Sequence, residues 1–214
     1  MSEPRTQHER GLELAGPAGR LEALYRPPAT DEAGGVLILH PHPLYGGTMH
    51  NKVIYTCQRV AAERGLATLR FNFRGVGTSA GQYDDGQGEQ ADVKAGLDHL
   101  AAELPGRPLT LMGFSFGAWL TLKVGAPDPR VGALIALGVP VGWAELGFLA
   151  GCGKPKLFVH GTRDQFCDPE ELRRRYPDFC APKHLEWIEG ADHFFTNQLD
   201  ELAAVLRERF PSLV

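Results

Sequence analysis

The chain has 214 residues, a net charge of −4 and 43% hydrophobic residues, which is ordinary for one globular domain with its own core. Its pI of about 6.1 argues against nucleic acid as a partner. No apolar run reaches the length of a membrane span, so no membrane partner is expected. The N-terminus is polar and the four cysteines form no C-x-x-C pair, so we expect free thiols and a cytoplasmic location.

Strand-like and helix-like segments alternate along the chain, which predicts a mostly parallel sheet with helices on both faces. The chain is expected to form a single domain over residues 1–214, with a flexible tail over residues 1–10. An opening hairpin is expected from residues 12–14 and 21–25. Further strands are expected at residues 35–40, 67–73, 109–114, 131–137, 156–161 and 183–188, and helices at residues 54–64, 88–103, 116–124, 169–175 and 196–209.

Residues 113–117 read Gly-Phe-Ser-Phe-Gly, a G-x-S-x-G pattern between an apolar strand and a helix. This context predicts a nucleophile elbow, a sharp turn with Ser115 at its tip. Gly113 and Gly117 lack a Cβ, as a strained turn and a close approach of strand and helix require. The alternative is that Ser115 only caps the helix, a position that serine favours.

A serine hydroxyl is a poor nucleophile without a base to accept its proton. His193, which follows the last expected strand, is the best-placed base, and Asp164, which follows the strand before it, is the expected acid. The order Ser115, Asp164, His193 is the chain order of α/β-hydrolases. Asp168 is the alternative acid, although Pro169 after it is typical of a helix N-cap. His193 could also be an ordinary loop histidine.

The fourth requirement is a pair of N–H donors for an oxyanion. One is expected to be the backbone N–H of Phe116, the residue after the nucleophile. The other is expected from the loop at residues 40–47, His-Pro-His-Pro-Leu-Tyr-Gly-Gly, in which the two prolines have no N–H. His42 is the preferred donor and Leu44 is the alternative.

Two further side-chain groups have competing interpretations. His40 and His42 could coordinate zinc, but a metal hydrolase needs more Asp and His ligands close by and a Gly-Gly follows instead. We therefore expect no metal and no cofactor, with His40 buried and hydrogen-bonded to neighbouring loops. Arg74 is expected to lock its loop by hydrogen bonds, and the alternative is that it binds a substrate anion.

The chain resembles the α/β-hydrolase superfamily and, more narrowly, the small bacterial hydrolases that lack a lid. The likeness runs from about residue 36 to the C-terminus. It rests on His-Pro-His-Pro-x-x-Gly-Gly at 40–47, Arg-Phe-Asn-Phe-Arg-Gly-Val-Gly-x-Ser at 70–79 and Asp-x-Gly-x-Gly-Glu at 84–89. It implies a mostly parallel twisted sheet with helices on both faces, no lid domain, and the same nucleophile, acid and base. One departure is His40-Pro41, where the superfamily frequently has His-Gly.

In larger relatives a lid is inserted where this chain has only residues 138–155. This segment leaves room for a loop and one short helix around residues 141–149. Its apolar residues are expected to form one edge that lines the acyl pocket or packs against a second subunit, so homo-oligomerisation stays open; they are Trp143, Leu146, Phe148 and Leu149. The candidate substrate-pocket residues are Tyr45, Trp143 and Phe148.

The expected reaction is hydrolysis of a small carboxylic ester, the small-molecule partner, through an acyl-enzyme on Ser115. An open site without a lid favours small or flexible esters over long lipids. Cleavage of amides or peptides, or transfer of the acyl group to an alcohol, is the second hypothesis. A non-catalytic binding protein with a hydrolase-like fold is the third.

Overall fold

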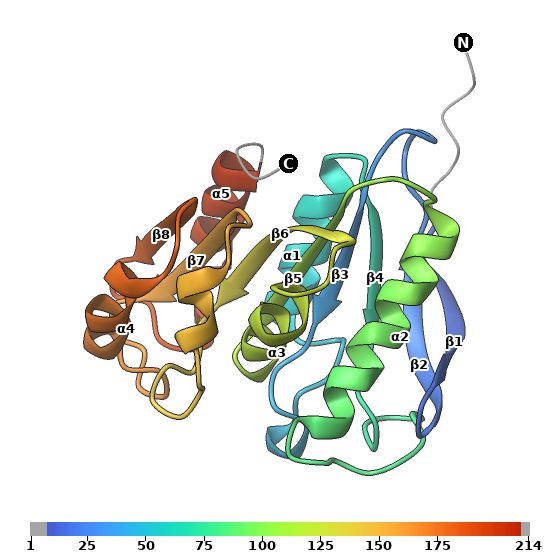
Figure 1. Ribbon diagram of the computed structural model, residues 1–214, viewed down its shortest axis with the longest axis horizontal. Helices are drawn as coiled ribbons and strands as arrows, with labels where there is room; N and C mark the ends of the chain where they lie inside the picture. The colour runs from blue at the N-terminus through green and yellow to red at the C-terminus, as the bar shows by residue number, and fades with distance from the viewer. Residues whose placement is uncertain (1–7, 211–214) are drawn as a thin grey trace.

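The computed structural model describes residues 8–210, and within them eight strands form one sheet in the order β1-β2-β4-β3-β5-β6-β7-β8 (Figure 1). Strands β1 and β2 form an antiparallel hairpin, and β2 is also antiparallel to β4. All the other neighbours are parallel. The strands are β1 (Arg10–Gly16), β2 (Gly19–Arg26), β3 (Gly35–Leu39), β4 (Ala67–Phe71), β5 (Leu109–Phe114), β6 (Val131–Leu137), β7 (Lys156–Gly161) and β8 (Lys183–Ile188).

Helices cover both faces of this sheet, as expected from the alternating segments. In Figure 1, α2 (Gln87–Glu103) and α3 (Phe116–Gly125) lie in front of the sheet, and α1 (Lys52–Glu63) and α5 (Leu199–Arg209) lie behind it. Each face has its own buried hydrophobic cluster, and α4 (Pro169–Arg175) adds Leu172 to the front one. Three short 3-10 helices complete the described elements: η1 (Pro43–Tyr45), η2 (Gly147–Gly151) and η3 (Tyr176–Asp178).

Strands β3, β4 and β5 are buried along their whole length, which explains why β3 appears in the sequence as a continuous apolar run and β5 as a mostly apolar one. Strand β5 lies in the interior of the sheet between β3 and β6. The loops that follow these parallel strands meet at one edge of the sheet, the place where α/β proteins bind ligands.

The ends of α1 agree with their sequence signals. Asn51 caps its start, since Oδ1 accepts the Val53 N–H over 2.9 Å. Gly65 ends it with φ +74°, a left-handed conformation that glycine adopts without strain.

Several element boundaries differ from the prediction, and two of the differences have a clear physical reason. Helix α5 begins at Leu199 rather than at residue 196, because Phe195 and Asn197 have φ of 53° and 57°, which no right-handed helix allows. Strand β4 ends at Phe71 rather than at residue 73. There the Asn72 side chain accepts the Met49 N–H, and the Phe73 N–H is donated to a histidine instead of to the sheet.

Of the flexible tail expected over residues 1–10, residues 1–7 lie outside the described part of the chain. Glu9 accepts two hydrogen bonds from the Arg70 guanidinium, at 3.0 and 2.7 Å, and Arg10 begins β1. Glu9 and Arg10 therefore belong to the folded part of the chain. Within the described residues, no helix combines the length and the apolar character that crossing a membrane requires.

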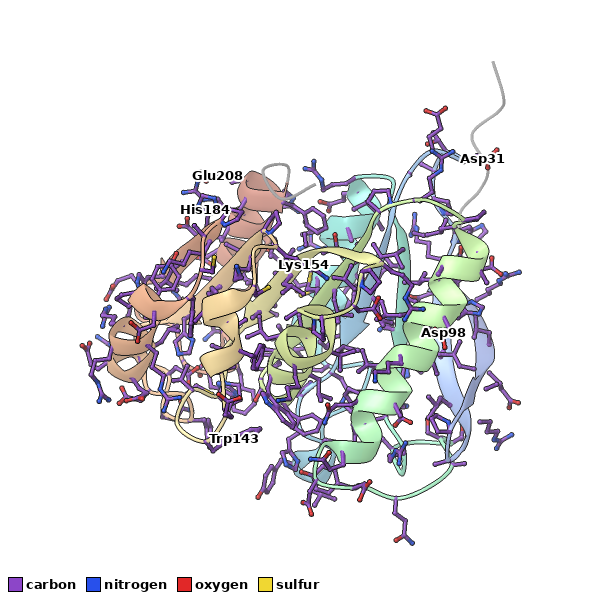
Figure 2. The ribbon with its side chains drawn as sticks, viewed as in Figure 1. Asp31, Asp98, Trp143, Lys154, His184 and Glu208 are labelled. Atoms are coloured by element: carbon purple, nitrogen blue, oxygen red, sulfur yellow. The ribbon has the colours of Figure 1, made fainter. Side chains whose placement is uncertain are left out.

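The segment between β6 and β7 carries no lid domain, since these described residues hold only loops and η2. The short helix lies at Gly147–Gly151, slightly later than expected. Leu146 and Leu149 are buried in the core, whereas Trp143 is 57% exposed, so the four apolar residues do not form one edge. Figure 2 shows Trp143 at the lower end of the molecule, far from His184 at the start of β8.

Candidate active site

Ser115 occupies a sharp turn between β5 and α3, with φ 56° and ψ −117°. A positive φ is strained for a residue with a side chain and is typical of functional sites. A Cβ on Gly113 would lie 2.2 Å from the Gly117 carbonyl oxygen, and a Cβ on Gly117 would lie 2.3 Å from that of Leu39. Both positions therefore require glycine. The Ser115 side chain makes no cap hydrogen bond to α3, which leaves the hydroxyl for another partner.

The structure brings the three predicted residues together. His193 Nε2 lies 3.0 Å from Ser115 Oγ, and His193 Nδ1 lies 2.8 Å from Asp164 Oδ2. Because a carboxylate only accepts hydrogen bonds, Nδ1 carries the proton and Nε2 is free to accept the serine proton. The other carboxylate oxygen, Asp164 Oδ1, accepts the N–H groups of Phe166 and Cys167 at 2.9 and 2.8 Å. Each link from serine to carboxylate is therefore a hydrogen bond.

Asp164 is held in its ionised form. Burial alone would raise the pKa of its carboxyl group, but the hydrogen bonds from His193 and from the Cys167 N–H hold the pKa below its usual value. A buried carboxylate beside Nδ1 can fix the imidazole tautomer and stabilise the imidazolium that proton transfer creates.

Asp168, the alternative acid, has a different role. Its side chain is exposed and accepts the Glu170 N–H over 3.0 Å, with Pro169 at the first position of α4. This is the helix N-cap that the Asp-Pro pair predicts.

His160 supports the Asp164 loop, and sequence reasoning missed it. His160 Nε2 donates to the Cys167 carbonyl oxygen over 2.6 Å and lies 3.5 Å from Asp164 Oδ2. Burial lowers the pKa of His160, so the ring is neutral. The sequence did contain a signal for His160, because it stands near the end of the predicted strand at residues 156–161 and four residues before Asp164.

Asp164, Cys167 and His193 are also a group of potential metal ligands, since their ligand atoms lie within 4.8 Å of one another. Both ring nitrogens of His193 already have hydrogen-bond partners in Asp164 and Ser115. In this arrangement His193 therefore has no free ring nitrogen to offer a metal ion.

The loop at residues 40–47 packs against the elbow. His40 is fully buried, as expected; Nδ1 donates to the Pro41 carbonyl oxygen over 2.6 Å and Nε2 accepts the Phe73 N–H over 3.0 Å. Complete burial lowers the pKa of His40 to about 3, so the ring is neutral. With both nitrogens engaged, His40 does not fit the alternative of a zinc ligand.

The backbone N–H groups of His42 and Leu44 differ in whether they already have an acceptor within the protein. The Leu44 N–H is donated to His42 Nδ1 over 3.2 Å, while His42 Nε2 lies 3.1 Å from the Tyr83 hydroxyl. The backbone N–H of His42 has no acceptor in the described part of the chain, and neither has that of Phe116. The two N–H groups preferred from the sequence are thus the ones available for an oxyanion.

The three candidate pocket residues lie in different places. Tyr45 is 85% exposed, and its ring centre lies 4.6 Å from that of His42. Trp143 packs edge-on against Trp119 on α3, with ring centres 5.4 Å apart. The Lys123 ammonium group lies over the Phe148 ring, 5.1 Å from its centre. Lys123 stands eight residues after Ser115, which is about 12 Å along α3. Tyr45 and Trp143 border the elbow, whereas Phe148 lies away from it.

Two exposed phenylalanines beside the base were not predicted. Phe166 and Phe194 are 64% and 48% exposed, and their ring centres lie 5.3 and 5.2 Å from that of His193. Both stand within two residues of a predicted site residue, which was the available signal. Large exposed hydrophobic side chains therefore flank Ser115 and His193, as at a site that binds apolar groups.

Arg74 has the structural role that was preferred for it. Its guanidinium is buried and forms an ion pair with Asp92 on α2. The charge is thereby neutralised inside the protein and not offered to a substrate anion.

Comparison with known proteins identifies the class that this fold and site define. An alpha/beta hydrolase domain model matches residues 36–203, and the chain belongs to that family. An uncharacterized protein of Rickettsia prowazekii is 36% identical over 202 residues, which cover 90% of this chain and 85% of that protein.

Solved structures narrow the class further. An alpha-beta serine hydrolase homologue from Coxiella burnetii is 38% identical with a TM-score of 0.87, covering 94% of this chain and 96% of that one. A serine hydrolase without lid from Xanthomonas campestris is 32% identical with a TM-score of 0.88, covering 99% and 98%. The α/β-hydrolase fold and the likeness to lidless serine hydrolases are thus confirmed.

Proposed function

We propose that the protein hydrolyses small carboxylic esters through an acyl-enzyme on Ser115, with His193 as general base and acid and Asp164 as its carboxylate partner. The hydrogen-bonded series from Ser115 Oγ through His193 to Asp164 Oδ2 is the observation that carries this proposal. Membership of the alpha/beta serine hydrolases supports the same chemistry.

The reaction would begin when Ser115 Oγ attacks the ester carbonyl carbon and its proton passes to His193 Nε2. The carbonyl oxygen becomes an oxyanion that the N–H groups of Phe116 and His42 stabilise. As the C–O bond breaks, His193 returns the proton to the departing alcohol, leaving an acyl group on Ser115. Water then repeats the sequence, with His193 as base, and releases the carboxylic acid.

The test compares wild type and Ser115→Ala on a short-chain aryl ester such as p-nitrophenyl acetate. Loss of the nucleophile together with the base–acid relay should lower kcat by about 10³-fold or more. A fluorophosphonate probe should label wild type and leave the variant unlabelled. If the variant hydrolyses the ester as fast as wild type, the assignment of Ser115 is wrong.

Two other functions use the same fold. Amide cleavage or transfer of the acyl group to an alcohol would need the same three residues, and matched ester, thioester and amide substrates separate these activities. A non-catalytic binding role would leave Ser115 unlabelled in folded protein. The ordered hydrogen bonds of Ser115, His193 and Asp164 favour catalysis over binding alone.

A cytoplasmic location completes the proposal. All four cysteines are free thiols, as expected from their spacing, and a reducing compartment would keep them so.

A further inference from the structure

A cavity of about 760 Å³ lies behind the sheet between the starts of α1 and α5. Its size falls within the range of about 300–1,000 Å³ that is usual for small-molecule sites. One wall comes from residues around the start of α1, including Thr48 and Lys52. The other comes from the chain that leads into α5, from Phe194 to Asp200. Nothing in the sequence pattern indicated this cavity, because its walls come from two segments that lie far apart in the sequence.

The cavity lies beside His193, the proposed general base. Phe194, which lines it, directly follows His193, and the two rings lie 5.2 Å apart between centres. The opposite wall continues from the loop that carries His42. Both loops beside Ser115 therefore run on into the walls of this cavity.

In the proposed mechanism, a cavity beside His193 lies on the side where the alcohol leaves. His193 delivers its proton to the alcohol oxygen that leaves, so the alcohol half of the ester must lie on the side of His193. The acyl half must then extend elsewhere. Trp143 and Trp119 offer it an aromatic surface beside the elbow, with the Trp119 ring centre 5.6 Å from that of Phe116.

The wall chemistry favours a polar alcohol. The side chains of Lys52, Asn197 and Asp200 are exposed on these walls, and within residues 8–210 none of them makes a hydrogen bond or an ion pair, although the charge of Asp200 also acts on Arg207. Lys52 can donate, Asp200 can accept and Asn197 can do both, and a hydroxyl group can satisfy each of them. A long alkyl alcohol would leave all three without a new partner and would dehydrate two charges.

We propose that this cavity binds the alcohol half of the substrate and that this alcohol is a short polyol, glycerol or a sugar. The inference rests on the proposed esterase function, and it deepens that function by naming the leaving group. Lys52, Asn197 and Asp200 would hold the hydroxyl groups, while Phe194 packs against the carbon skeleton.

The test uses glyceryl monobutyrate and ethyl butyrate, two esters with the same acyl group and different alcohols. Wild type should have a kcat/KM for the glyceryl ester higher by about tenfold, the worth of one or two net hydrogen bonds. The double variant Lys52→Ala/Asp200→Ala should lose that preference, and the loss should appear as a higher KM for the glyceryl ester.

Two further variants isolate the effect. Asn197→Gly removes the amide while glycine accepts the φ of 57°, and it should also reduce the preference for the glyceryl ester. Glu201→Ala is the matched control, because Glu201 is exposed on the same first turn of α5 and does not line the cavity. This variant should have the wild-type kcat/KM for both esters.

The outcomes separate the two proposals. If wild type hydrolyses ethyl butyrate but shows no preference for the glyceryl ester, the polyol inference is wrong and the esterase remains. If the double variant loses both activities equally, the cavity does not bind the alcohol. If wild type hydrolyses neither ester and a fluorophosphonate probe does not label Ser115, the proposed function itself fails.

Discussion

Arg74 and Asp92 form a two-point ion pair that joins the loop after β4 to α2. Arg74 Nε donates to Asp92 Oδ2 over 3.0 Å, and Nη2 donates to Oδ1 over 2.8 Å. The backbone N–H of Arg74 also donates to Oδ2, over 3.1 Å. Three hydrogen bonds therefore end on one fully buried carboxylate, which makes Asp92 a structural centre of this side of the site.

Removing that carboxylate should destabilise the protein. We expect Asp92→Ala to lower the free energy of unfolding by about 3 kcal/mol, because Arg74 would stay buried without its partner. Urea unfolding measures this. Asp98→Ala is the control on the same helix, since Asp98 is largely exposed (Figure 2) and its loss should change stability by about 1 kcal/mol or less. Equal losses in both variants would contradict the assigned role.

Asp164→Asn should lower kcat by about 10³- to 10⁴-fold with little change in KM, because an amide cannot stabilise the imidazolium and favours the wrong tautomer. Stopped ester assays with single-turnover controls measure this loss. Asp168→Asn is the matched control, since asparagine also caps helices well, and it should leave kcat within about twofold. A large kcat loss in Asp168→Asn alone would return the acid role to Asp168.

The oxyanion donor on the loop at 40–47 can be tested with two substitutions at one position. His42 has φ −54°, which proline accepts, so His42→Pro removes the N–H while keeping the backbone shape. His42→Ala removes the same side chain and keeps the N–H. We expect kcat of His42→Pro to be about 100-fold below that of His42→Ala. Equal rates would mean that this N–H does not stabilise the oxyanion.

Buried histidine should make the fold sensitive to acid. The pKa of His40 is lowered to about 3 in the folded protein, whereas an unfolded histidine titrates near 6.5. Between these values the unfolded state binds more protons, so the His40 contribution is complete above pH 6.5 and is lost as pH falls toward 3. The loss is about 1.4 kcal/mol per pH unit, or about 2 kcal/mol at pH 5.

His40→Gln tests this. Glutamine can still accept the Phe73 N–H but does not titrate. We expect the difference in unfolding free energy between pH 7 and pH 5 to be smaller in the variant than in wild type, as measured by urea unfolding at both pH values. An unchanged pH dependence would show that His40 is not the group responsible.

Much of the fold could be predicted because most of the buried parallel strands leave apolar runs in the sequence, and the proposed nucleophile, acid and base each lie in a segment that follows a predicted strand. His160 and the paired N–H donors to Asp164 could not be predicted, since they depend on how the loop after β7 folds back. The start of α5 could not be predicted because the loop after His193 imposes a positive φ on Phe195 and Asn197, and for phenylalanine this conformation is unusual. The cavity was missed because it exists only once α1 and α5 lie side by side.

Ser115 and His193 follow strands that differ in how well the rest of the sheet holds them. Ser115 leaves an interior strand, whereas His193 follows β8, an edge strand that pairs only with β7 and is half-buried or exposed along most of its length. Such an edge opens locally at a lower free energy than the whole domain unfolds. Mild denaturant would therefore separate His193 from Ser115 while β3 to β6 stay folded, and inactivation would precede the loss of secondary structure.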